Sequence, residues 1–159
     1  MFRLSKLADY GIVIMTNLAR RPDRQFSAGE IAADSLIPHP MASKVLKGLT
    51  RAGLLTSHRG VKGGYGLARP GEMITVAEVI TALEGPIALT ACIDEGPGGC
   101  DIEALCPARA NWQRINDAIR TALDGVTLAE MARAIPEAFA APVEKVARFD
   151  ENSADIGSA

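Results

Sequence analysis

The sequence lacks several features that large classes of protein require. No apolar run approaches the roughly 20 residues of a membrane span, and the N-terminus shows neither the apolar block nor the cleavage site of a secretory signal. Equally missing are a nucleophile–base pair, a catalytic carboxylate pair and a phosphate-cradling loop between a strand and a helix. We therefore expect a cytoplasmic protein that has no membrane partner and is not an enzyme.

Cysteine is scarce, and its few copies are clustered. All three cysteines, Cys92, Cys100 and Cys106, fall within one glycine-rich stretch. An odd number of thiols in a reducing compartment disfavours disulfides and favours metal or redox chemistry. Four interpretations stay open: buried structural cysteines, a zinc site, a thiol redox switch and an iron–sulfur cluster.

The spacing ranks these interpretations without deciding among them. Zinc sites favour paired Cys-x2-4-Cys spacing and four ligands, whereas this stretch reads C-x7-C-x5-C and both histidines, His39 and His58, lie elsewhere. The polar, glycine-rich residues 94–99 disfavour a structural core. An iron–sulfur cluster tolerates wide spacing in a loop, and three thiolates would leave one iron for a different ligand.

Charge is divided unevenly along the chain. Residues 1–70 carry eleven Lys or Arg against four Asp or Glu, a balance of +7, while residues 71–159 carry six against fifteen, a balance of −9. A basic half is typical of proteins that lie on a phosphate backbone. The first half is therefore expected to bind double-stranded DNA.

Apolar periodicity predicts a mainly α fold. An amphipathic helix ends near residue 20, a Ser27–Glu30 capping box begins a short second helix, and a third carries an apolar stripe from Ala42 to Leu49. Two short helices joined by a tight turn make a helix-turn-helix. Strands expected at 54–57 and 65–68 flank a glycine-rich turn, which predicts a two-stranded β wing and hence a winged helix-turn-helix.

The second half is expected to connect and dimerise. A capping box at Thr75–Glu78 opens a helix, and a long amphipathic helix after Pro107 has no obvious partner in its own chain, which predicts a homodimer through this helix. The predicted organisation is a DNA-binding domain (1–70), a connecting helix (71–86), a cysteine loop (87–107), a dimerisation helix with a short helix (108–135) and a tail (136–159) that is expected to be partly disordered.

Candidate DNA contacts follow from this arrangement. Ser43 and Lys44 are expected to read bases, whereas Arg3, Lys6 and Lys47 suit phosphate contacts. The alternative for each lysine is a solvated surface residue. The candidates from charge and position are Arg3, Lys6, His39, Ser43, Lys44, Lys47, Arg59 and Lys62.

Several motifs together resemble the Rrf2 family of bacterial transcription regulators. They are RLSKLADYG, RGVKGGYGLARP, ITVAEVITALEGP and the C-x7-C-x5-C loop that runs into a long helix, covering residues 1 to about 135. Within that family the chain is most similar to regulators of the SUF iron–sulfur assembly operon. The resemblance implies a homodimeric winged-helix repressor or activator that holds one iron–sulfur cluster per subunit, 2Fe-2S or 4Fe-4S. It assigns Cys92, Cys100 and Cys106 as ligands, and Arg59, Gly63, Gly64 and Tyr65 as the wing contact to DNA.

The fourth ligand departs from part of the family. IscR-type members place a histidine three residues after the last cysteine, where this chain has Arg109, which cannot ligate. NsrR-type members use an aspartate of the first helix, contributed by the partner subunit, and Asp9 matches it. Rival ligands are Asp94, Asp101 and Glu103, and Asp9 could instead pair with Lys6. Alternative functions are a nitric-oxide- or iron-responsive regulator, as for the relatives NsrR and RirA, or a cluster or metal carrier that does not bind DNA.

Overall fold

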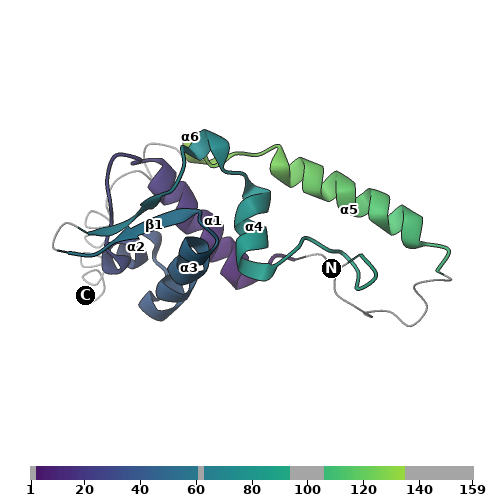
Figure 1. Ribbon diagram of the computed structural model, residues 1–159, viewed down its shortest axis with the longest axis horizontal. Helices are drawn as coiled ribbons and strands as arrows, with labels where there is room; N and C mark the ends of the chain where they lie inside the picture. Colours follow the sequence, from purple (N-terminus) through teal and green to yellow (C-terminus); the bar gives the residue numbers. More distant parts are fainter. Residues whose placement is uncertain (1–2, 61–62, 94–105, 135–159) are drawn as a thin grey trace, which may run out of the picture.

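The computed structural model describes residues 3–60, 63–93 and 106–134 (Figure 1). These residues form a mainly helical fold with one two-stranded sheet, as the sequence predicted. The elements are α1 (Lys6–Ala19), α2 (Ala28–Ser35), α3 (His39–Arg51), β1 (Leu55–His58), β2 (Gly64–Leu67), the short 3-10 helix η1 (Gly71–Met73), α4 (Val76–Glu84), α5 (Arg109–Asp124) and α6 (Leu128–Arg133).

The helix-turn-helix is formed by α2, α3 and the turn between them. The predicted capping box is present at the start of α2, where the Ser27 hydroxyl accepts from Glu30 N–H and the Glu30 carboxylate accepts from Ser27 N–H. The helix ends at Leu36, whose φ of 54° is left-handed and turns the chain sharply. Pro38 then precedes α3, where a residue without an N–H is well tolerated.

A continuous apolar core lies between α1 and the helices around it. Gly11 lets α1 approach α4 closely, because a Cβ at this position would collide with Leu83. The inner face of α3 contributes to the same core, and so does Leu128 of α6. Its largest fully buried side chains are Phe26, Ile14, Met15, Leu46, Leu49, Ile74, Leu128, Val45 and Val79.

The wing is an antiparallel hairpin of β1 and β2 in which Leu55 pairs with Leu67 and His58 pairs with Gly64. Each strand is displaced by one residue from its expected position. Phe26, from the segment before α2, adds a bridge to Tyr65: Phe26 N–H donates to Tyr65 O at 3.0 Å, and Tyr65 N–H donates to Phe26 O at 2.8 Å. The helix-turn-helix and the wing are therefore fastened to each other.

The two C-terminal helices differ in how they lie against the rest of the protein. α5 extends away from the rest of the protein, and α6 then packs back beside α1 and η1 (Figure 1). Val76 N–H donates to Val126 O at 2.9 Å, and Leu128 N–H donates to Ile74 O at 3.0 Å. Within residues 3–60, 63–93 and 106–134, no helix is long and apolar enough to cross a membrane.

Candidate nucleic-acid interface and cysteine site

The third helix has two chemically distinct faces. Ala42, Val45, Leu46 and Leu49 are fully buried against the core. On the opposite side, Lys44, Lys47 and Arg51 are exposed and follow one another at three- and four-residue spacing, which places them in one row. The helix contains no Asp or Glu. It therefore presents a continuous row of positive charge to solvent.

The expected contact residues of α3 lie as follows. His39 is exposed at the first turn, Ser43 is half-buried, and Lys44 and Lys47 are exposed. Sequence reasoning missed Arg51, although extending the row of lysines by one helical turn would have found it. The row thus reaches from the middle of α3 to its last residue.

Ion pairing separates the cations of the N-terminal half into two groups. Arg21 pairs with Asp34, Arg24 with Glu30 at 2.6 Å and Arg69 with Glu78 at 2.7 Å. Lys44, Lys47, Arg51 and Arg59 form no ion pair with any residue that the structure describes. Positive charge is therefore largely neutralised beside α2 and α4 but stays available on α3 and the wing.

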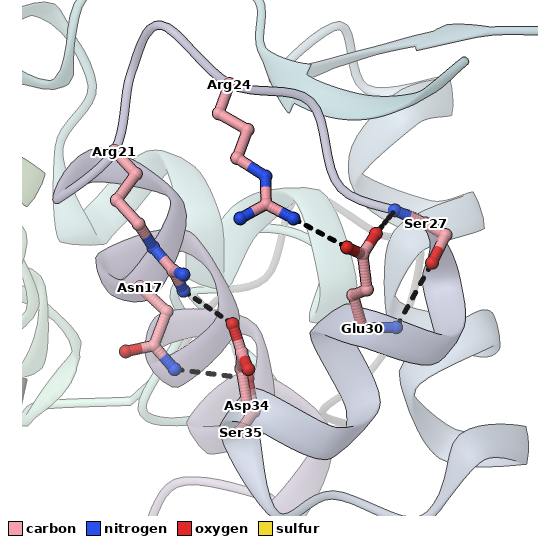
Figure 2. A network of polar contacts seen from close by, with 7 residues as sticks. All are labelled: Asn17, Arg21, Arg24, Ser27, Glu30, Asp34 and Ser35. Atoms are coloured by element: carbon pink, nitrogen blue, oxygen red, sulfur yellow. Dashed lines mark hydrogen bonds and ion pairs between the residues drawn. The ribbon is translucent and has the colours of Figure 1, made fainter. Parts of the chain in front are cut away.

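The paired arginines brace the joint between α1 and α2 (Figure 2). The guanidinium groups of Arg21 and Arg24 lie over the buried Phe26 ring, 4.4 and 4.6 Å from its centroid. Hydrogen bonds from the Ser27 N–H and hydroxyl, together with the charge of Arg24, lower the pKa of Glu30 despite slight desolvation. Asn17 Nδ2 adds a bond to Ser35 Oγ at 3.1 Å. These contacts hold α2 in place and so set the position of α3.

The wing residues divide between exposed charge and backbone packing. Arg59 is exposed near the tip, while Lys62 lies outside the described residues. A Cβ on Gly64 would stand 2.6 Å from Phe26 O, and one on Gly63 would collide with His58 O. Gly63, Gly64 and the half-buried Tyr65 therefore have structural roles within the hairpin. At the start of the chain, Arg3 and Lys6 are exposed, next to and within the first turn of α1.

Two of the expected ligand thiols lie in the described part of the chain. Cys92 is buried and shares a hydrogen bond with Thr90, with 3.2 Å between Sγ and Oγ1. Cys106 is half-buried just before α5, and both residues are free thiols. Cys100 falls within 94–105, outside the described residues, as do the rival ligands Asp94, Asp101 and Glu103. Among the residues described, no three His, Cys, Asp or Glu side chains converge as metal ligands.

The expected fourth ligand, Asp9, is exposed in the first turn of α1. Its carboxylate forms no ion pair with Lys6 or with any other residue in the described ranges. Chemically, a set of three thiols and one carboxylate suits iron, since thiolates hold iron–sulfur clusters and a harder oxygen ligand can complete one iron. The donor types thus fit the expected cluster, and the exposure of Asp9 leaves its carboxylate accessible to a second subunit.

The long helix α5 reverses the usual order of burial. Trp112 is 40% exposed and Ile115 is 45% exposed, whereas Asn116 is 2% exposed. The expectation that α5 has no partner in its own chain was wrong. It contacts α4, and Leu123 packs against the small cluster of Ala8, Val76 and Ile80. Asn116 hydrogen-bonds to the backbone that follows α4. The Trp112–Ile115 side of the helix still faces solvent.

Comparisons with known proteins agree with this geometry. Residues 4–134 match the Rrf2 family, described as an iron-dependent transcriptional regulator. A Mycobacterium tuberculosis protein named as an HTH-type transcriptional regulator is 33% identical over 138 residues, covering 85% of this chain and 84% of its own length. The HTH-type transcriptional regulator CymR of Bacillus subtilis is 33% identical over 132 residues, covering 82% of this chain and 89% of its own.

Two solved structures extend the likeness to three dimensions. The structure of CymR, the global cysteine regulator of B. subtilis, superposes with a TM-score of 0.68 at 31% identity and covers 86% of this chain and 100% of that one. The structure of T. potens IscR gives a TM-score of 0.66 at 29% identity and covers 86% of this chain and 90% of that one. The proteins that this chain resembles are transcriptional regulators and not enzymes.

Proposed function

Because the chain belongs to the Rrf2 family of transcriptional regulators, we propose that it is a homodimeric repressor that senses an iron–sulfur cluster. The DNA-binding part of this proposal is carried by the basic row of α3. Lys44, Lys47 and Arg51 project from a helix whose other face is fixed in the core, and no described carboxylate competes for them. A rigid helix with free cations suits the major groove, and Arg59 on the wing suits the adjoining backbone.

The homodimer is supported by the exposed side of α5. Trp112 and Ile115 leave a large apolar surface in solvent on a helix that extends from the rest of the protein (Figure 1). An identical stripe on a second copy would cover it about a two-fold axis. Dimerisation would place the α3 helices of the two subunits so that each can bind one half-site of an operator.

The cluster part of the proposal is supported by the donor types around α5. Cys92 and Cys106 would hold the cluster together with Cys100, and Asp9 of a partner subunit would complete it. A bound cluster supplies a cross-link between these residues that oxygen, nitric oxide or iron loss can break. Asp9 lies on α1, which contacts α3, so its constraint or release would reach the DNA-binding helix.

A thiol switch is the second candidate, favoured by the likeness to CymR, which is named as a cysteine regulator. Cys92 and Cys106 are free thiols, and oxidation of either would alter the same segment without iron. The two candidates differ in what they require. Cluster sensing needs bound iron, whereas a thiol switch responds in iron-free protein.

The DNA-binding part is tested by selecting genomic fragments that bind the full-length protein and then measuring affinity by fluorescence anisotropy. Lys44→Ala is expected to weaken binding by about ten- to a hundredfold, the effect of losing a base contact. The affinity of the wild type should fall steeply with salt, because phosphate contacts release counterions. Arg133→Ala is the matched control, since Arg133 is an exposed cation of α6 that lies outside the proposed interface. Equal losses in both variants would contradict the interface.

The cluster is tested by anaerobic reconstitution followed by absorption and Mössbauer spectra. Cys100→Ser should abolish the cluster signal, and Asp9→Asn should shift the spectrum and speed bleaching in air. DNA affinity is measured before and after cluster removal. A protein that takes up no iron, yet changes DNA affinity when its thiols are oxidised, would reject cluster sensing and favour the thiol switch.

A further inference from the structure

We propose that Asn116 is a positioning residue that couples Cys92 to α5, the helix expected to form the dimer interface. This inference rests on the proposed function, because it gives the cysteine segment a route to the DNA-binding form. The observation behind it is the burial pattern of α5, in which a polar side chain is buried and large apolar side chains are exposed. Within Arg109–Asp124, all of which the structure describes, Asn116 is the one buried residue.

Both ends of the Asn116 amide are used. Its Oδ1 accepts a hydrogen bond from Leu89 N–H at 3.1 Å, and its Nδ2 donates to Ile87 O at 2.9 Å. The side-chain amide therefore accepts from and donates to the backbone of residues 87–89, as the backbone of an adjacent β-strand would. A buried amide is tolerated only when its donor and acceptor groups are both satisfied, so this segment is held in one register on α5.

The bonded segment leads directly to the first thiol. Leu89 is followed by a turn in which Ile93 N–H donates to Thr90 O at 3.0 Å. That turn carries Cys92, whose Sγ lies 3.2 Å from Thr90 Oγ1. Any displacement of Cys92 is therefore transmitted through this short, hydrogen-bonded turn to the amide of Asn116.

The second described thiol is tied to the same helix by the chain itself. Arg109 N–H at the start of α5 donates to Cys106 O at 3.4 Å. Asn116 follows seven residues after Arg109, which corresponds to about 10 Å along the helix axis. Cys92 and Cys106 are thus both connected to the first half of α5. The connection of Cys92 runs through the hydrogen bonds of Asn116, and that of Cys106 runs through the backbone.

A buried asparagine can also be only a well-bonded core residue. In that case its loss would lower stability without changing how Cys92 communicates with DNA binding. The coupling is therefore measured without any cluster, by alkylating Cys92 with iodoacetamide in reduced, iron-free, full-length protein. A Cys100→Ser, Cys106→Ser background leaves Cys92 as the sole thiol. Asn111→Ala is the matched control, because Asn111 is an exposed asparagine of the same helix.

In Asn116→Ala, we expect the Leu89 amide to exchange hydrogen about tenfold faster and Cys92 to alkylate about tenfold faster, as the loss of neutral hydrogen bonds predicts. In the parent, alkylation of Cys92 should change affinity for the selected DNA at least about fivefold. In Asn116→Ala this response should fall below about twofold, while Asn111→Ala should respond like the parent.

An alkylation response of equal size in the parent and in Asn116→Ala would overturn the coupling, and so would a parent that does not respond. Should Asn116→Ala fail to fold by circular dichroism, Asn116→Asp replaces it, because Asp keeps an acceptor for Leu89 N–H but loses the donor to Ile87 O. Failure of the cluster proposal would give a different result from failure of the coupling through Asn116. The wild type would then take up no iron, while the exchange and alkylation results would still decide the role of Asn116.

Discussion

Two regions of the molecule differ in which side chains they bury: one buries apolar side chains, and the other buries a polar one. We call α1–α4, the wing and α6 the body, and α5 with residues 87–93 the arm. In the body, α3 has Leu46 and Leu49 fully buried and its lysines outside. In the arm, Trp112 and Ile115 are 40% and 45% exposed, while the polar Asn116 is 2% exposed.

The difference shows which region is complete by itself. The body buries the inner faces of its helices in one core, and its most exposed large apolar side chains, Leu36 and Met73, lie outside its long helices. The arm leaves apolar area in solvent and buries an amide to hold a backbone segment. Such a helix gains stability only when something else covers it. The exposed side of the arm is the surface that the proposed homodimer would cover, whereas most of the body's apolar side chains are covered within one chain.

The largest expected effect comes from charging the exposed side of the arm. If Ile115 lies in a dimer interface, Ile115→Glu would bury an unpaired carboxylate there once per subunit. We expect the dimer dissociation constant to rise at least about a thousandfold, or about 4 kcal/mol, with little change in the helical content of the body. Sedimentation velocity over a range of protein concentrations measures this change.

Gln113→Glu introduces the same carboxylate two residues away on the same helix, at an exposed position where Gln113 bonds to Asp117. We expect this control to dimerise like the wild type. If Ile115→Glu also stays dimeric, the apolar side of α5 does not form the interface.

The second effect tests whether the body is as tightly packed as its burial indicates. A Cβ on Gly64 would lie 2.6 Å from Phe26 O and 2.8 Å from Phe26 C, and neither backbone atom can move without breaking the bridge to Tyr65. Gly64→Ala should lower the free energy of unfolding by about 2 kcal/mol, as overpacking does. Urea titration followed by circular dichroism measures it.

Gly66 provides a control in the same strand. A Cβ there would meet Gln25 Cγ at 3.7 Å, which is an ordinary contact. Gly66→Ala should therefore change the free energy of unfolding by no more than about 0.5 kcal/mol. Equal losses in the two variants would mean that strand glycines matter for a reason other than the approach of Phe26.

Sequence patterns predicted the body better than the arm because the body is determined by local signals. The predicted capping boxes formed at Ser27 and Thr75, where a motif of four consecutive residues decides the helix start. The strands differ from their expected positions by one residue at each boundary, while the register agrees, since Ala68 N–H still donates to Leu54 O at 3.0 Å beyond the ends of β1 and β2. Local chemistry sufficed where the contact was local.

The candidate site shows the same limit. The lysines of α3 were identifiable from charge and spacing, but the pair of Arg21 with Asp34 joins residues that lie 13 positions apart in the sequence. Asn116 was missed because apolar periodicity directs attention to Ile115 and Ile119, whereas the buried position is polar. A polar residue inside such a stripe is the signal that could have found it. Its partners, at Ile87 and Leu89, needed the structure.

The smallest effect concerns the charge that ties the wing's end to α4. Partial burial raises the pKa of Glu78, but hydrogen bonds from Arg69 and Thr75 N–H and the Arg69 charge outweigh it and leave this pKa below its ordinary value of 4.5. The carboxylate therefore stabilises the folded protein above about pH 4.5, and this contribution is lost as pH falls through the folded pKa.

Glu78→Gln keeps the capping oxygen and removes the charge. It should lower the free energy of unfolding by about 0.5 kcal/mol at pH 7. Urea titrations at pH 7 and at about pH 3.5 should show the deficit shrinking in acid. Glu72→Gln, at an exposed position without an ion pair among the described residues, should match the wild type at both pH values. A deficit for Glu78→Gln that stays constant in acid would place its cause in packing and not in the charge.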